Sequence, residues 1–174
     1  TASADANLTF VDGASSVVLD STYKEYLFTF NNIHPATDDS KLLVNFRDGG
    51  TDYDATKTTT FFRAQHSEGG ANGNLSYRTD DDLAQSTAAQ PLTMDIGNAN
   101  DESASGEMIL YNPSSTTFVK HFIANANCVY SGDYSMQSFV AGYCNVTAAI
   151  DAVQFTMEGG TNIDSGDICL YGIL

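Results

Sequence analysis

The chain has 174 residues, of which 42% are hydrophobic and 17% are charged, and its formal net charge is −15. One domain covering residues 1–174 fits this length, and the apolar content excludes a disordered acidic chain. An excess of 22 acidic over 7 basic residues excludes nucleic acid as a partner, because such a surface repels phosphate. No stretch approaches the ~20 continuous apolar residues of a bilayer-spanning helix, so we expect no membrane insertion.

The residue composition favours strands over helices. Ser and Thr together number 34 and Asn 13, whereas Glu numbers 5 and Lys 4. Thr, Val, Tyr and Phe suit a pleated sheet, and Asn, Asp, Gly and Ser suit tight turns, while good helix formers are scarce. We therefore expect an all-β chain.

Apolar runs separated by turn residues predict the strands in chain order. Residues 7–11 and 15–20 flank Asp12-Gly13, a dipeptide typical of a hairpin turn. In residues 23–31, Tyr26, Phe28 and Phe30 share one face, with a period of two rather than 3.6. Further strands are expected at 41–47, 58–66, 94–96, 107–112, 118–125, 138–144, 150–157 and 167–173. Strands this short and this numerous predict a jelly-roll-like antiparallel β-sandwich.

The last of these strands, residues 167–173, has apolar side chains on both faces. Ile168 and Leu170 alternate with Cys169, Tyr171 and Ile173. A strand that is apolar on both faces is typical of the middle of a sheet. The sequence therefore predicts that the chain ends in a central strand.

Three cysteines, Cys128, Cys144 and Cys169, are too few for a fully paired disulfide framework and match no zinc-binding spacing. Cys128 and Cys144 would pair if their strands were adjacent. Alternatively, each is a small buried apolar residue with a free thiol. We favour the buried thiols.

No motif in the chain carries catalytic chemistry, so we name no catalytic residue and no cofactor. The sequence contains no GxSxG, HExxH, GxxxxGK[ST] or GxGxxG pattern. Hard oxygen ligands do cluster in two turn-rich segments, which makes Asp80, Asp82, Asn100 and Asp101 weak candidates for a structural calcium site. Clustered Asp is more often a solvated turn, and that is our first interpretation here.

The C-terminal residues resemble a known family. The runs IDAVQF at 150–155, NIDSGDI at 162–168 and LYGI at 170–173 are similar to the chain ends of a family of tailed-phage virion structural proteins, many from marine and cyanobacterial phages. The likeness extends upstream to residues 21–24, 32–37, 57–62, 82–87, 112–122 and 141–143. The chain departs from that pattern in its three cysteines, in the turn at 158–161 and in its final Leu174.

This resemblance implies a non-enzymatic protein on the surface of a virion. We expect a capsid decoration or cement protein, because the chain is one compact acidic domain without heptads or repeats. Its expected partners are the major capsid or tail proteins, and it is expected to form a homo-oligomer, with a trimer the favoured form.

Two other functions remain open from the sequence. One is a tail-fibre or receptor- and carbohydrate-binding module, whose contacts would come from the loops at 68–74 and 97–106. The other is a secreted β-sandwich glycan hydrolase, which would need two facing carboxylates.

Overall fold

The computed structural model describes residues 1–174, and its regular secondary structure is almost entirely strand. The strands are β1 (Ala2–Asp5), β2 (Asn7–Val11), β3 (Glu25–Pro35), β4 (Leu42–Arg47), β5 (Lys57–Ser67), β6 (Asn74–Tyr77), β7 (Gln90–Pro91), β8 (Ala104–Tyr111), β9 (Lys120–Tyr130), β10 (Tyr134–Cys144), β11 (Ala152–Met157) and β12 (Ile163–Ile173). A single 3-10 turn, Glu158–Gly160, follows β11. The structure contains no helix with the length and apolar character needed to cross a bilayer.

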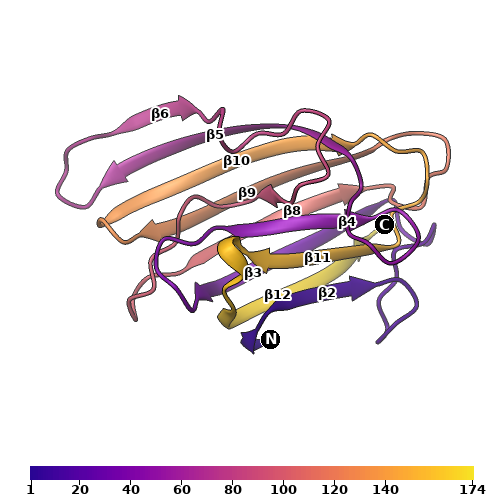
Figure 1. Ribbon diagram of the computed structural model, residues 1–174, viewed down its shortest axis with the longest axis horizontal. Helices are drawn as coiled ribbons and strands as arrows, with labels where there is room; N and C mark the ends of the chain where they lie inside the picture. Colours follow the sequence, from indigo (N-terminus) through magenta and orange to yellow (C-terminus); the bar gives the residue numbers. More distant parts are fainter.

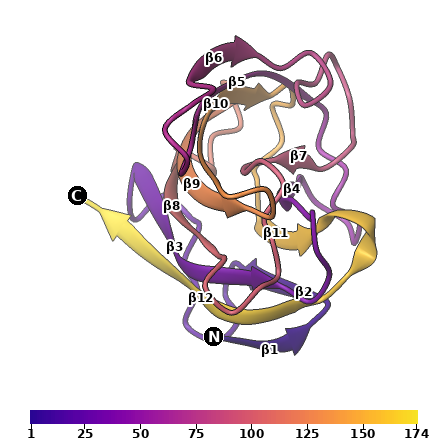
Figure 2. The same ribbon diagram turned by 90° about the vertical axis from the view of Figure 1, so that its left-hand side faces the viewer.

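The strands form two antiparallel sheets that face each other (Figures 1 and 2). Sheet A has the order β1-β12-β3-β8-β9-β10-β5-β6, and sheet B has the order β2-β11-β4-β7. Figure 2 shows sheet A curving around the smaller sheet B. The prediction of an all-β antiparallel sandwich is confirmed.

The strand order is that of a jelly roll with two added pairs of strands. Without β5, β6, β9 and β10, the remaining eight strands pair as β1-β12-β3-β8 and β2-β11-β4-β7. These are the two four-stranded sheets that two Greek keys produce. The β5–β6 and β9–β10 hairpins extend sheet A beyond β8.

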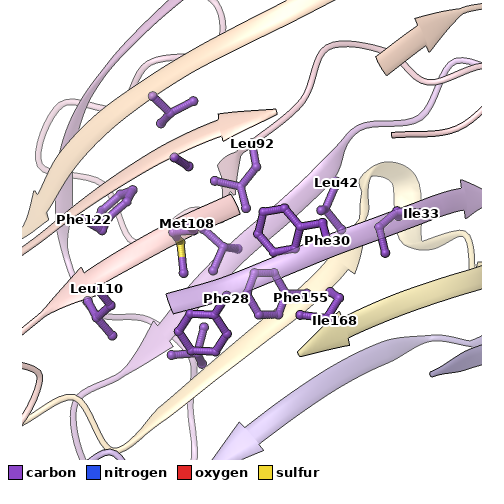
Figure 3. Packing of buried hydrophobic residues seen from close by; sticks show 14 of the residues in the cluster. Phe28, Phe30, Ile33, Leu42, Leu92, Met108, Leu110, Phe122, Phe155 and Ile168 are labelled. Atoms are coloured by element: carbon purple, nitrogen blue, oxygen red, sulfur yellow. The ribbon is translucent and has the colours of Figure 1, made fainter. Parts of the chain in front are cut away.

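The core lies between the sheets and is built from alternating positions. Phe28 and Phe30 of β3 each lie 5.4 Å, between ring centroids, from Phe155 of β11 (Figure 3). Phe10 of β2 packs against the same rings, and its ring centroid lies 5.4 Å from that of Phe28. Full burial of each such ring contributes roughly 1.5–3 kcal/mol, so these aromatic contacts hold the two sheets together.

The predicted hairpin around Asp12-Gly13 is wrong. β2 pairs with β11, and residues 15–20 form no strand. The Asp12 carboxylate instead accepts a hydrogen bond from the Leu19 backbone amide at 2.8 Å, and Gly13 donates to the Val17 carbonyl. These local bonds fold the segment into a loop that delivers Leu19 to the core.

The prediction that residues 167–173 form a central strand is wrong. β1 pairs with β12 from Ile163 to Gly166, but no strand lies on that side of residues 167–173. Ile168 is buried, whereas Tyr171 and Ile173 are exposed. Apolar side chains on both faces therefore did not indicate burial on both faces.

Candidate functional site

A row of apolar side chains crosses the outer face of sheet A. The strand registers place Tyr171 opposite Leu27, Leu27 opposite Ile109, Ile109 opposite Ile123, and Ile123 opposite Ala141. These five residues, which we call the apolar row, come from β12, β3, β8, β9 and β10. Ile123 and Tyr171 are 45% and 51% exposed. Since cross-strand neighbours on one face are about 5 Å apart, the row is continuous.

Aromatic side chains border the apolar row towards β6. Phe62 of β5 stacks on Phe139 of β10, with ring centroids 4.8 Å apart and planes at 12°. Tyr77 of β6 lies opposite Phe62, and both are exposed. On the other side of the row, the rings of His121 and Tyr143 lie 5.9 Å apart. The apolar row and these flanking rings together form what we call the outer patch.

Two adjoining hollows indent the outer patch. One of about 380 Å³ is lined in part by His121, Tyr143 and Thr58, and one of about 210 Å³ in part by Phe62 and Phe139. They share Thr60, Ile123 and Ala141. Small Ala141 lies between larger neighbours on both adjacent strands, which explains the depression.

The outer patch is nearly free of charge in a strongly acidic chain. Alternation along β3, β8, β9, β10, β5 and residues 167–173 of β12 places three of the 22 acidic residues on this face, Glu25, Glu107 and Asp167. A contiguous exposed apolar surface is typical of a binding site. The patch is broad and shallow, which suits contact with another macromolecule.

The calcium candidates do not come together as a ligand set. Nowhere in the chain do three or more His, Cys, Asp or Glu side chains gather so as to hold a metal ion. Asp82 accepts a hydrogen bond from the Tyr77 hydroxyl at 2.5 Å. Asp80, Asn100 and Asp101 are exposed in turns. The solvated-turn interpretation describes these residues.

Asp81, between the two calcium candidates on its segment, is buried and paired. Its carboxylate lies 2.9 Å from Lys41 Nζ and 2.9 Å from Arg78 Nε. Burial raises the pKa of Asp81, but the hydrogen bonds from Lys41 and Arg78 outweigh it, so the pKa lies below its ordinary value. The sequence of the Asp80–Asp82 run does not show that Asp81 is buried and paired, because its partner Lys41 is distant in the sequence.

Two fully buried lysines, which sequence reasoning missed, flank Cys144. Registers place Cys144 of β10 between Lys57 of β5 and Lys120 of β9. Lys57 Nζ donates to Asn45 Oδ1 at 2.5 Å, and burial lowers its pKa to about 8. Lys120 Nζ donates to three carbonyls, those of Ser115, Val146 and Ala148, and burial lowers its pKa too. The Asn45 side chain of β4 and carbonyl oxygens from loops thus accept hydrogen bonds from the two ammonium groups, so both lysines connect β5 and β9 to neighbouring segments.

The cysteines are free, and the pairing of Cys128 with Cys144 is wrong. Cys128 lies opposite Met136, near the start of β10, whereas Cys144 ends that strand. Both thiols are buried, as the favoured interpretation predicted, and desolvation raises the pKa of each to about 12.

Carboxylates gather around one polar hollow of about 500 Å³. Asp38, Asp39 and Glu158 line it together with the glycines of the 3-10 turn. The hydrolase alternative would find its acid pair here, although sequence reasoning singled out none of these residues as catalytic. The loops at 68–74 and 97–106 lie elsewhere in the chain and line no hollow.

Comparison with known proteins assigns no family. No family model matches the chain, and no curated protein matches it. One solved structure with partial similarity is a structural-genomics protein of unknown function from Bacteroides ovatus, at 6% identity and a TM-score of 0.33. The alignment spans 60% of this chain and 45% of that one.

Proposed function

We propose that this chain is a non-enzymatic structural protein of a tailed-phage particle, displayed on the exterior as a capsid decoration or cement protein. The observation that carries the proposal is the outer patch, a nearly uncharged apolar surface in a chain with a net charge of −15. The resemblance of residues 150–173 to virion proteins supplies the phage context. In this proposal the outer patch binds a major capsid or tail protein.

The distribution of charge supports an exterior position. Of the 22 acidic residues, only Glu25, Glu107 and Asp167 lie at strand positions on the face that carries the outer patch. A chain bound through that face would turn its acidic loops towards solvent and away from packaged DNA, which such loops repel. Burial of Ile123, Phe62 and Tyr171 would supply the binding free energy, since apolar surface is the main source of it.

Reconstitution on particles tests this proposal. Particles of the phage that encodes the chain, lacking its gene product, are mixed with purified chain and sedimented. We expect co-sedimentation, and immunogold labelling over the capsid shell. Ile123→Asp places a charge within the apolar row and should lower binding at least tenfold, which is about 1.4 kcal/mol.

The matched control places the same charge on the other side of the sandwich. Thr9→Asp lies on an exposed position of β2 in sheet B and should bind like the wild type. Equal binding by Ile123→Asp, or no binding by the wild type, would reject the proposal. Immunogold labelling at the fibre tips would place the chain in the tail instead.

A carbohydrate-binding module is the second candidate, because the 380 Å³ hollow combines a Tyr143 ring with hydroxyl groups of Thr58 and Thr60. Sugars bind to such mixtures of aromatic faces and hydroxyls. Binding to a glycan array that Tyr143→Ala removes, with Thr9→Asp unchanged, would favour this function. Absence of glycan binding by the wild type would exclude it.

A further inference from the structure

The face that carries the outer patch has carboxylates but no basic side chain. No lysine or arginine occupies an outward position of sheet A, since three lie at inward positions, Lys57, Arg63 and Lys120, and four lie outside its strands, Lys24, Lys41, Arg47 and Arg78. Of the three carboxylates on the face, Asp167 accepts a hydrogen bond from the Thr1 hydroxyl. Glu25 and Glu107 take part in no ion pair of the chain. The face therefore presents two carboxylates whose charge nothing on it balances.

These two carboxylates lie on opposite sides of the apolar row. Leu27 and Ile109 face each other within the row. Two residues further along the strands, Glu25 faces Tyr111 on one side of the row, and Glu107 faces Thr29 on the other. At ~3.4 Å per residue and ~4.8 Å between strands, the positions of Glu25 and Glu107 are roughly 14 Å apart. A macromolecule that covers the row between them therefore covers both carboxylates as well.

Covering these carboxylates costs free energy unless the partner supplies positive charge. The cross-strand neighbours of Glu107 are Thr29 and Asn125, which are uncharged. Tyr111, beside Glu25, is uncharged too. A carboxylate that loses its hydration without gaining an opposite charge destabilises the complex, whereas a close pair with a lysine or arginine stabilises it. The two glutamates thus restrict which partners can bind.

We infer that the partner of the outer patch is a protein surface with an apolar centre and two lysine or arginine side chains, one placed over Glu25 and one over Glu107. This inference rests on the proposed function, in which the outer patch is the binding face, and it names the chemistry of that partner. The net charge of −15 also attracts a basic surface over a longer range, which speeds association at low salt.

The same charges exclude other occupants of this face. Two copies of the chain joined through their outer patches would bring carboxylates towards carboxylates, with no basic side chain on either face. A surface that carries phosphate would be repelled for the same reason. A neutral glycan or a wholly apolar surface would leave Glu25 and Glu107 without an opposite charge.

The direction in which substitutions at Glu107 change the affinity distinguishes these partners. Particles that lack the gene product are titrated with purified chain and sedimented. Glu107→Gln keeps the size of the side chain and removes its charge, so we expect weaker binding than that of the wild type. Glu107→Lys should bind more weakly still, because it repels the cation of the partner. The double variant Glu25→Gln with Glu107→Gln should lose at least about tenfold in affinity.

The matched control removes the same amount of charge elsewhere. Asp80→Asn with Asp101→Asn changes two exposed carboxylates in turns outside the strands, and this double variant should bind like the wild type. Raising the salt concentration from about 0.1 M to about 1 M shortens the Debye length from about 10 Å to about 3 Å. That change should weaken binding of the wild type more than binding of the double glutamate variant. Unfolding midpoints close to that of the wild type show that the variants are folded.

Four results would overturn this inference. Tighter binding by Glu107→Gln would indicate a neutral partner, and tighter binding by Glu107→Lys an anionic one. Unchanged binding by the double glutamate variant would mean that the partner covers neither carboxylate. An oligomer of the purified chain that Ile123→Asp dissociates would make a second copy the occupant.

The failure of this inference is distinct from the failure of the proposed function. If the wild type binds particles and Ile123→Asp does not, the outer patch is the binding face, whatever the glutamate variants do. If the wild type binds no particle, the proposed function and this inference are both rejected.

Discussion

Lys41 Nζ lies 2.9 Å from Asp81 Oδ1, and this ion pair joins the segment before β4 of sheet B to the segment after β6 of sheet A. The Asp81 side chain is 1% exposed and that of Lys41 14%. Arg78 Nε donates to the second carboxylate oxygen at 2.9 Å. The ion pair therefore connects the two sheets. It also gives the buried Asp81 carboxylate a partner of opposite charge, which apolar packing would not supply.

We predict that Asp81→Asn lowers the free energy of unfolding by about 3 kcal/mol, because it leaves two partly buried cations without their shared carboxylate. Asp80→Asn, on the exposed neighbour, should change stability by less than about 0.5 kcal/mol. The pKa of Asp81 is lowered in the folded chain, so its contribution is present above the unfolded pKa of about 3.9 and is lost as the pH falls below it. Urea denaturation at several pH values checks both expectations. If the difference in unfolding free energy between the wild type and Asp81→Asn stayed constant down to pH 3, the lowered pKa of Asp81 would be contradicted.

Lys57 should make stability rise with pH in the alkaline range. Burial lowers its pKa to about 8, whereas an unfolded lysine has a pKa of about 10.4, so the unfolded chain binds more protons between these values. The unfolding free energy of the wild type relative to Lys57→Met should therefore increase between pH 8 and 10, by at most about 1.4 kcal/mol per pH unit. Denaturant titrations are made in a Cys144→Ala background, because the neighbouring thiol also titrates. If the unfolding free energy relative to Lys57→Met decreased over that range, the lowered pKa of Lys57 would be refuted.

The three thiols should react at very different rates. Burial raises the pKa of Cys128 and Cys144 from 9.0 to about 12, which lowers the thiolate fraction about a thousandfold, since each unit is tenfold. Cys169 is partly exposed on β12. A disulfide reagent should therefore label one thiol rapidly in the native chain and the other two only on unfolding. Cys169→Ser should remove the fast phase; a fast phase that persists would show that another thiol is accessible.

Gly142 should not tolerate a side chain. A Cβ there would lie 2.6 Å from Thr59 Cγ2 and 2.8 Å from the Thr58 carbonyl oxygen. Thr59 cannot rotate away at no cost, because its hydroxyl donates to Gln90 and accepts from the Leu83 amide. Gly142→Ala should therefore destabilise the chain by about 2 kcal/mol, as overpacked cores are. Thermal unfolding measures this.

The control for that substitution is Gly73→Ala, whose nearest contact is the His66 side chain at 3.3 Å. That imidazole is exposed and can move, so the control should shift the unfolding midpoint little. If Gly142→Ala and Gly73→Ala shifted the unfolding midpoint equally, Thr59 and its strand would have to move aside at little cost in free energy.

Strand positions were largely predictable, whereas the partners of the strands were not. The alternation of Tyr26, Phe28 and Phe30 predicted β3 and its buried face. Asp12-Gly13 indicated a turn, but the local signal could not show that β2 pairs with the distant strand β11. Likewise, Leu27, Ile109 and Ile123 each lie beside other apolar residues in the sequence, and only the strand registers show that these three form one outward-facing row.

The sequence by itself determined the class of structure and the sign of the surface charge, because side-chain alternation and composition are local properties of the chain. The tertiary structure decided which apolar positions are covered and which acidic residues are paired. Those outcomes depend on which strands become neighbours and how far each neighbour extends. Strand pairing is a collective result of contacts between residues far apart in the chain, and no local pattern records it.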